Sequence, residues 1–284
     1  MSEYQYYEFP AIDRPLCGAD MRWLRSLSTR ARITPKRFVN TYRWGGFKGD
    51  PVKLMTRCLD AFVYFANFGY CRFMLRLPAG SISLKQTRAY CRGRSPRPVK
   101  ARGCVLLEFV CDGEGENWDP ADNGSGWMAS GVPLRGVWLG GDGRCLYPAW
   151  LLHVQSEALG ERTPEPPVLP GLNERTGPLM ALADFRRIDR TLIDVAAERS
   201  GPGGTTAFSG VQLRAVLRKL PASGKGRLLI QVLRKEDRVD RQRVLNGLGG
   251  RMVADNPLSR ARRTVPLRTV GELFAEWDGR GRNT

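Results

Sequence analysis

The amino-acid sequence predicts an α+β (or α/β) fold, with an N-terminal sheet covered by two helices and a mainly helical C-terminal part. Two spacings of apolar residues along the chain lead to this prediction. Residues 1–111 contain stretches in which apolar side chains recur every second position, the pattern of a strand, and stretches with a spacing of three and four, the pattern of a helix. After residue 170 the helical spacing dominates. We therefore expect a sheet-and-helix domain over 1–111. An acidic loop, a buried helical segment and a Pro-rich linker follow over 112–170, and a basic helical region with a disordered tail over 171–284.

The segment 50–78 is the clearest element of the N-terminal part. Asp50 is suited to cap a helix, and Pro51 is suited to its first position, where no N–H is needed. Apolar residues over 54–66 recur at helical spacing, and Gly69 is placed to end the helix. Residues 71–78 then alternate, so a strand is expected to follow the helix directly.

The remaining elements follow from the same two spacings. The expected strands are Tyr4–Phe9, Arg37–Trp44 and Val105–Cys111. The expected helices are one that starts at Asp20 and then Tyr147–Ala158, Leu172–Phe185, Ile188–Glu198, Val211–Leu220, Arg227–Leu248 and Thr269–Trp277. Thr163–Pro170 has polyproline character and is the preferred domain boundary. The periodicity leaves the direction of the strands open.

The charge is strongly positive. The 284 residues include 45 lysines and arginines against 28 acidic residues, for a net charge of +17. Such a balance is typical of nucleic-acid-binding proteins. A codon bias toward arginine, glycine and proline explains it equally well. The charge is unevenly distributed, because two basic parts flank an acidic centre at 112–170.

The cysteines and the apolar runs bear on the cellular compartment. The seven cysteines include no C-x-x-C pair, which is typical of reduced, buried thiols and argues against a structural zinc site. No apolar run approaches the roughly 18 residues that a membrane-spanning helix needs. The first residues lack the features of a secretory signal. We therefore expect a cytoplasmic protein with no membrane partner and no cofactor.

A basic segment is the candidate nucleic-acid-binding site. It contains no acidic residue, its prolines and glycines predict an irregular loop, and Tyr90 offers a stacking surface. Its basic residues are Lys85, Arg88, Arg92, Arg94, Arg97, Lys100 and Arg102. Such a loop can neutralise phosphates without reading bases. The alternative is a solvated loop with no partner. A solvated surface with no partner is the preferred interpretation of the basic helix expected over 227–243, because acidic residues interleaved along it can pair with the arginines.

Three further sequence patterns give only weak support for a binding or catalytic site. Residues 45–49 form a glycine-rich turn before Asp50, but its carboxylate would occupy the place of a phosphate. The acidic residues over 112–122 do not match an EF-hand, so contact with the basic parts is preferred to a metal site. The single histidine, His153, lies in an apolar stretch and is interpreted as a core residue.

Several phrases of the sequence resemble a family of uncharacterised bacterial proteins. They are YQYYEF at Tyr4–Phe9, AIDRPL at Ala11–Leu16, STRARITP at Ser28–Pro35, FKGDP at Phe47–Pro51 with KLM at Lys53–Met55, MLRLP at Met74–Pro78, GWMAS at Gly126–Ser130 and WLLHVQS at Trp150–Ser156. The resemblance implies no activity and no catalytic residues. Proteins of this kind are similar to ones encoded beside SWIM-type zinc-finger proteins and helicases, which implies a role associated with nucleic acid.

These observations give two hypotheses and a third, weaker one. The first is a non-enzymatic cytoplasmic protein that associates with nucleic acid, or with a nucleic-acid-processing complex, through Arg-rich surfaces. The alternative is a protein–protein scaffold without direct nucleic-acid contact. An enzyme comes third, because the chain has one histidine and no recognised catalytic motif.

Overall fold

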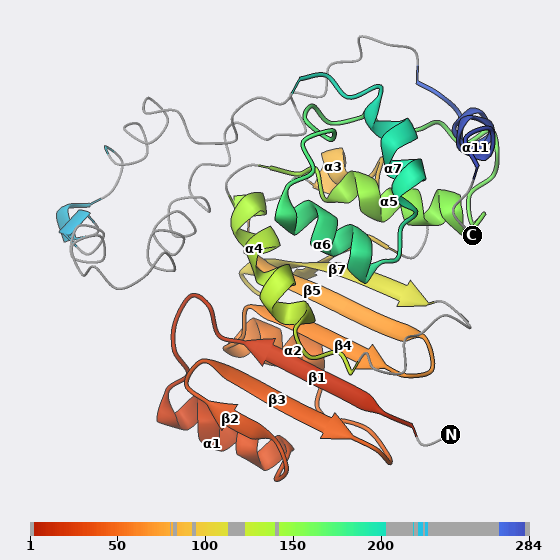
Figure 1. Ribbon diagram of the computed structural model, residues 1–284. Helices are drawn as coiled ribbons and strands as arrows, with labels where there is room; N and C mark the ends of the chain where they lie inside the picture. Colours follow the sequence, from red (N-terminus) through yellow and green to blue (C-terminus); the bar gives the residue numbers. More distant parts are fainter. Residues whose placement is uncertain are drawn as a thin grey trace. The chain divides into compact units, whose positions relative to one another are not determined.

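The chain forms two compact units, each described here by itself (Figure 1). The computed structural model describes residues 3–79, 81, 84–92, 95–112, 123–139, 142–202, 218, 221–223, 225–226 and 267–281. The first unit contains Met1–Pro78 and Cys91–Val132, and the second contains Ala79–Tyr90 and Pro133–Thr284. A sheet in the N-terminal half and helices that lie mostly later in the chain confirm the predicted α+β class.

The first unit is built on a seven-stranded sheet with the order β2-β3-β1-β4-β5-β7-β6. The strands are β1 (Gln5–Pro10), β2 (Arg32–Thr34), β3 (Arg37–Tyr42), β4 (Ala61–Ala66), β5 (Tyr70–Pro78), β6 (Arg97–Ala101) and β7 (Cys104–Asp112). Every neighbouring pair is antiparallel. The expected strands near β1, β3, β5 and β7 are confirmed, whereas β2, β4 and β6 were not expected.

The helix expected over residues 50–66 is much shorter in the structure. Asp50 caps it as predicted, because its side chain accepts a hydrogen bond from the Val52 N–H at 2.9 Å, but α2 covers only Pro51–Arg57. Residues 61–66 form β4, and Gly69, with a φ of +90°, lies in the turn to β5. Because β4 is buried on both faces, its apolar run shows no alternation and is indistinguishable from a helix by spacing.

Two helices cover one face of the sheet, as predicted. They are α1 (Gly18–Leu27) and α2, and Leu24 and Leu54 from them are fully buried in one core cluster with Phe9 and Phe62. The rings of Phe9 and Phe62 stack with centroids 4.3 Å apart. The expected helix start at Asp20 is two residues late, because α1 begins at Gly18. Cys17 is the N-cap of α1, and Asp20 is the third helical residue, which completes a capping box.

The second unit is helical in its described part. Its helices are α3 (Leu84–Thr87), α5 (Leu146–Gln155), α6 (Gly177–Phe185), α7 (Arg190–Ala197) and α11 (Val270–Asp278), and α4 (Trp127–Leu139) begins in the first unit and ends in the second. The helices expected near α5, α6, α7 and α11 are therefore present, although α6 begins later than expected. Those expected at 211–220 and 227–248 lie almost wholly outside the described residues. Within the described part, no helix has the length and apolar character needed to cross a membrane.

The Pro-rich segment, expected as a domain boundary, lies inside the second unit. Glu165 from this segment is buried and forms a bidentate ion pair with Arg268, at 2.9 Å from both Nε and Nη2. Tyr147 donates its hydroxyl to the same carboxylate. Backbone hydrogen bonds add to this contact, for instance from the Glu165 N–H to the Arg268 carbonyl at 2.7 Å. The segment therefore anchors the start of α11.

Candidate nucleic-acid interface

The residues of the predicted basic segment lie in both units. Arg88 belongs to the second unit, whereas Arg92, Arg97, Lys100 and Arg102 belong to the first. All five are exposed. The side chain of Lys85 and the whole of Arg94 lie outside the part of the chain that the structure describes. Among the residues that the structure describes, four of the seven predicted ones, Arg92, Arg97, Lys100 and Arg102, therefore lie on the first unit.

Residues 97–101 form a strand and not the irregular loop that the sequence predicts. They make up β6, which is the last strand at one edge of the sheet and pairs with β7 through a tight turn at Arg102–Gly103. Gly103 has a φ of +71°, which favours glycine. Pro98 is tolerated because an edge strand needs no N–H on its open side, and Lys100 discourages pairing with another chain. The exposed basic side chains are therefore held on an ordered hairpin.

Tyr90 does not offer the stacking surface that was expected of it. Its side chain is buried in the second unit, with 2% of the residue exposed. Its hydroxyl donates to the Pro167 carbonyl at 2.6 Å, and burial raises its pKa. The ring is thus a packing element beside Tyr147, whose centroid lies 6.5 Å away.

A buried carboxylate fixes two arginines beside this hairpin. Glu108 of β7 lies opposite Arg97, and its Oε2 accepts hydrogen bonds from Arg97 Nε at 2.8 Å and Nη2 at 2.6 Å. Its Oε1 accepts a hydrogen bond from Arg72 of β5. The Glu108 side chain is 2% exposed, whereas the Arg97 side chain is 63% exposed. The three groups carry a net positive charge, and a guanidinium held in place on one side still presents N–H donors on the other.

Four carboxylates of the first unit are buried in the part of the chain that the structure describes. Each buried carboxylate forms an ion pair with a more exposed arginine: Glu8 with Arg37, Asp20 with Arg14, Asp60 with Arg76, and Glu108 with Arg72 and Arg97. Glu3, Asp13 and Asp50 are the exposed carboxylates among the described side chains of this unit. The exposed basic side chains are more numerous, among them Arg22, Arg30, Lys36, Arg43, Lys48, Arg92, Lys100 and Arg102. Among the side chains that the structure describes in this unit, the exposed charged groups are therefore mostly basic.

A row of tyrosines crosses four strands beside these arginines. Tyr42 of β3, Tyr7 of β1, Tyr64 of β4 and Tyr70 of β5 lie on one face, with successive ring centroids 5.7, 4.7 and 5.7 Å apart. This is the face that α1 and α2 cover: Tyr7 is buried in the same core cluster as Phe9 and Phe62, with the Phe47 ring centroid 5.5 Å from its own, and the other three tyrosines are half-buried. Arg72 lies directly opposite Tyr64 in the strand register. Sequence reasoning did not find this row, because its members come from four separate strands and one of those strands was expected to be a helix.

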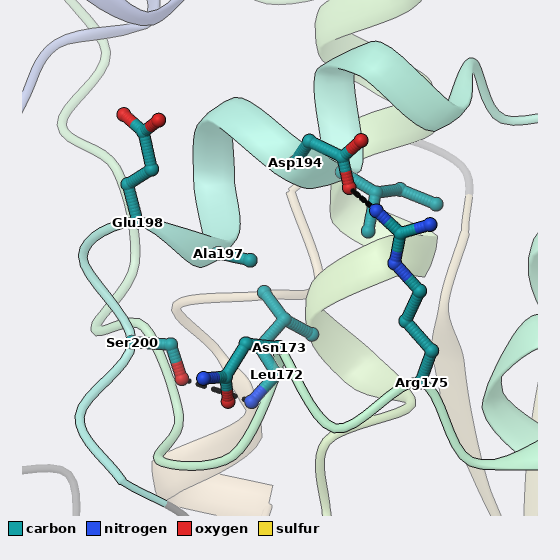
Figure 2. A pocket seen from close by; sticks show the side chains of 8 residues that line it. Leu172, Asn173, Arg175, Asp194, Ala197, Glu198 and Ser200 are labelled. Carbon is teal, nitrogen blue, oxygen red and sulfur yellow. Dashed lines mark hydrogen bonds and ion pairs between the residues drawn. The ribbon is translucent and has the colours of Figure 1, made fainter.

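The second unit contains an open pocket of about 390 Å³ between residues 172–175 and 193–200 (Figure 2). Arg175 and Asp194 form an ion pair on its wall, and Glu198 pairs with Arg280 at 2.6 Å. The Ser200 hydroxyl accepts a hydrogen bond from the Leu172 N–H and donates one to the Leu169 carbonyl, both at 2.8 Å. These charged groups and the hydroxyl are engaged in holding the fold, so the pocket presents no nucleophile with an adjacent base.

The other candidates from the sequence add no catalytic site in the described residues. His153 lies in α5 with 7% of the residue exposed and does not line the pocket. No group of three metal-ligating side chains comes together in the part of the chain that the structure describes. The acidic residues at 114–122 lie outside that part. The turn before Asp50 leads into a helix of only seven residues, already capped by the Asp50 carboxylate.

Comparisons with known proteins give no match. Neither the models of known protein families, nor the curated proteins, nor the solved structures contain one that is significantly similar to this chain. The function must therefore be argued from the residues themselves.

Proposed function

We propose that this is a non-enzymatic, cytoplasmic protein that binds nucleic acid through the basic surface of its first unit. The observation that carries the proposal is the separation of charges in that unit. Its buried carboxylates each face inward against an arginine, while most of its lysines and arginines face solvent. A surface of this kind attracts polyphosphates over a distance and releases their counterions on binding.

The β6–β7 hairpin supplies phosphate contacts in this proposal. Lys100 and Arg102 are exposed on it, and Arg92 is exposed in the segment that leads to it. Arg97 adds a guanidinium whose orientation Glu108 fixes. Such contacts position a nucleic acid without reading its sequence, so we expect weak dependence on base sequence and strong dependence on salt.

The proposal is tested by a charge-reversal variant with a matched control. The variant carries Arg92→Glu, Lys100→Glu and Arg102→Glu, and the control carries Arg22→Glu, Arg30→Glu and Lys36→Glu near α1 and the opposite edge of the sheet. All six side chains are exposed, so the two variants have equal net charge and comparable structural risk. Binding of labelled oligonucleotides is measured by fluorescence anisotropy at several salt concentrations.

We expect the hairpin variant to lose affinity, and its plot of log K against log salt concentration to become less steep by about 2, since each lost single-strand phosphate contact removes about 0.7 from the slope. The control is expected to lose less affinity and to keep most of its slope. Equal effects of the two variants would show that net charge alone matters and would contradict the assignment of contacts to the hairpin. Failure of the unaltered protein to bind at low salt would contradict the function itself.

A further inference from the structure

Aromatic side chains gather at one end of the sheet in the first unit. At this end β1 and β5 begin and β3, β4 and β7 stop, as their antiparallel pairing requires (Figure 1). Trp44, two residues beyond β3, is 78% exposed, and Phe68, in the turn between β4 and β5, is 56% exposed. Together with Leu267 of the second unit, they are the exposed large hydrophobic residues of the described chain. Core packing does not account for side chains that are exposed to this extent.

The tyrosine row crosses strands β3 to β5, the strands whose ends lead to these two exposed rings. Tyr42 precedes Trp44 on β3, and Tyr70 follows Phe68 on β5. With a strand spacing of about 4.8 Å, the row from β3 to β5 spans about 14 Å. In RNA-binding sheets of four strands, aromatic side chains on one face stack two or three bases. Half-buried rings anchored in a sheet lose little conformational freedom when a base stacks on them.

The surroundings of the row are basic. Arg72 lies opposite Tyr64 and is held by Glu108, while Arg43 and Lys48 are exposed in the segment that contains Trp44. Three carboxylates also belong to these segments: Glu3, whose charge acts on Tyr64, Asp50, two residues beyond Lys48, and Asp112, opposite Tyr70 in the strand register. Rings that accept bases and cations that accept phosphates therefore occur together, which is the combination that single-stranded nucleic acid requires.

We propose that this end of the sheet is a binding site for single-stranded nucleic acid. The site rests on the function proposed above and specifies its substrate class. Bases stack on Trp44, Phe68 and the half-buried tyrosines, and Arg72, Arg43 and Lys48 contact the backbone. A duplex keeps its bases stacked inside the helix and cannot use the rings, so it binds only through the basic surface.

The test removes the two exposed rings and measures three ligands. The variant is Trp44→Ala with Phe68→Ala, and Leu267→Ala is the matched control, an exposed apolar side chain on the second unit. The probes are oligo(dT), oligo(U) and a duplex DNA of equal length, followed by fluorescence anisotropy. We expect the double variant to bind both single strands about 10- to 100-fold more weakly, as the loss of one or two stacking contacts predicts, and the duplex nearly as well as the unaltered protein. The control is expected to bind all three normally.

A second readout reports on stacking directly. Titration of oligo(dT) is expected to quench part of the intrinsic fluorescence, and Trp44→Phe, which keeps a ring for stacking, is expected to remove that quenching while it preserves most of the affinity. The proposed site would be overturned if the alanine variant bound single strands as well as the unaltered protein and if binding caused no quenching of Trp44 fluorescence. In that case the charge-reversal variants would still decide whether the basic surface binds nucleic acid. Equal weakening of duplex and single strands would also overturn it. Absence of all binding at low salt would overturn both proposals.

Discussion

At the scale of single residues, each buried carboxylate that the structure describes in the first unit is paired with an arginine. Glu108 is the clearest case, because it is buried and its carboxylate is shared between Arg72 and Arg97. A buried charge is tolerated only with such partners. The net charge can be read from the sequence. The face of the sheet on which each charged side chain lies cannot be read from the sequence, because it depends on the pairing register of strands that are far apart in the chain.

The replacement Glu108→Gln tests this arrangement. We expect the free energy of unfolding of the first unit to fall by about 1–2 kcal/mol, since an amide accepts weaker hydrogen bonds than a carboxylate, but the exposed parts of the arginines can still be hydrated. Urea denaturation followed by circular dichroism measures the loss. Glu3→Gln, at an exposed carboxylate, is the control and is expected to change stability by less than about 0.5 kcal/mol. Equal stability of both variants would show that the Glu108 ion pairs do not stabilise the sheet.

At the scale of elements, the sequence predicts ends and caps better than it predicts pairing. The cap at Asp50 and the strand up to Pro78 are recognisable because they depend on neighbouring residues. Residues 61–66 are not recognisable as a strand, because burial on both faces removes the alternation of apolar and polar residues that identifies one. The strand β6 is hidden by Pro98 and by basic residues that are typical of loops. The tyrosine row follows from these pairings, so its discovery required the structure.

The contact between the Pro-rich segment and the start of α11 is an element-scale feature that can be tested by mutation. Arg268→Ala leaves the Glu165 carboxylate buried without its bidentate partner, and we expect the second unit to lose about 3–5 kcal/mol of unfolding free energy. Denaturation followed by tryptophan fluorescence measures this loss. Arg190→Ala removes an exposed ion pair to Asp184 and is expected to cost less than about 1 kcal/mol. Similar losses in the two variants would contradict an anchoring role for Arg268.

At the scale of the whole molecule, the central claim is that the excess of arginine is functional and not a product of codon bias. The two explanations make different predictions about the surface. Bias alone has no reason to place exposed aromatic rings beside a group of exposed basic side chains. In the first unit these features occur together.

The most direct test is the affinity of the unaltered protein for oligo(dT) and for duplex DNA, measured by fluorescence anisotropy over a range of salt concentrations. We predict binding to both at low salt, tighter for the single strand, with log K falling by about 2 or more for each tenfold increase in salt, as expected for three or more phosphate contacts. Absence of binding at low salt, or an affinity that does not change with salt, would contradict the account. The positive charge would then be compositional.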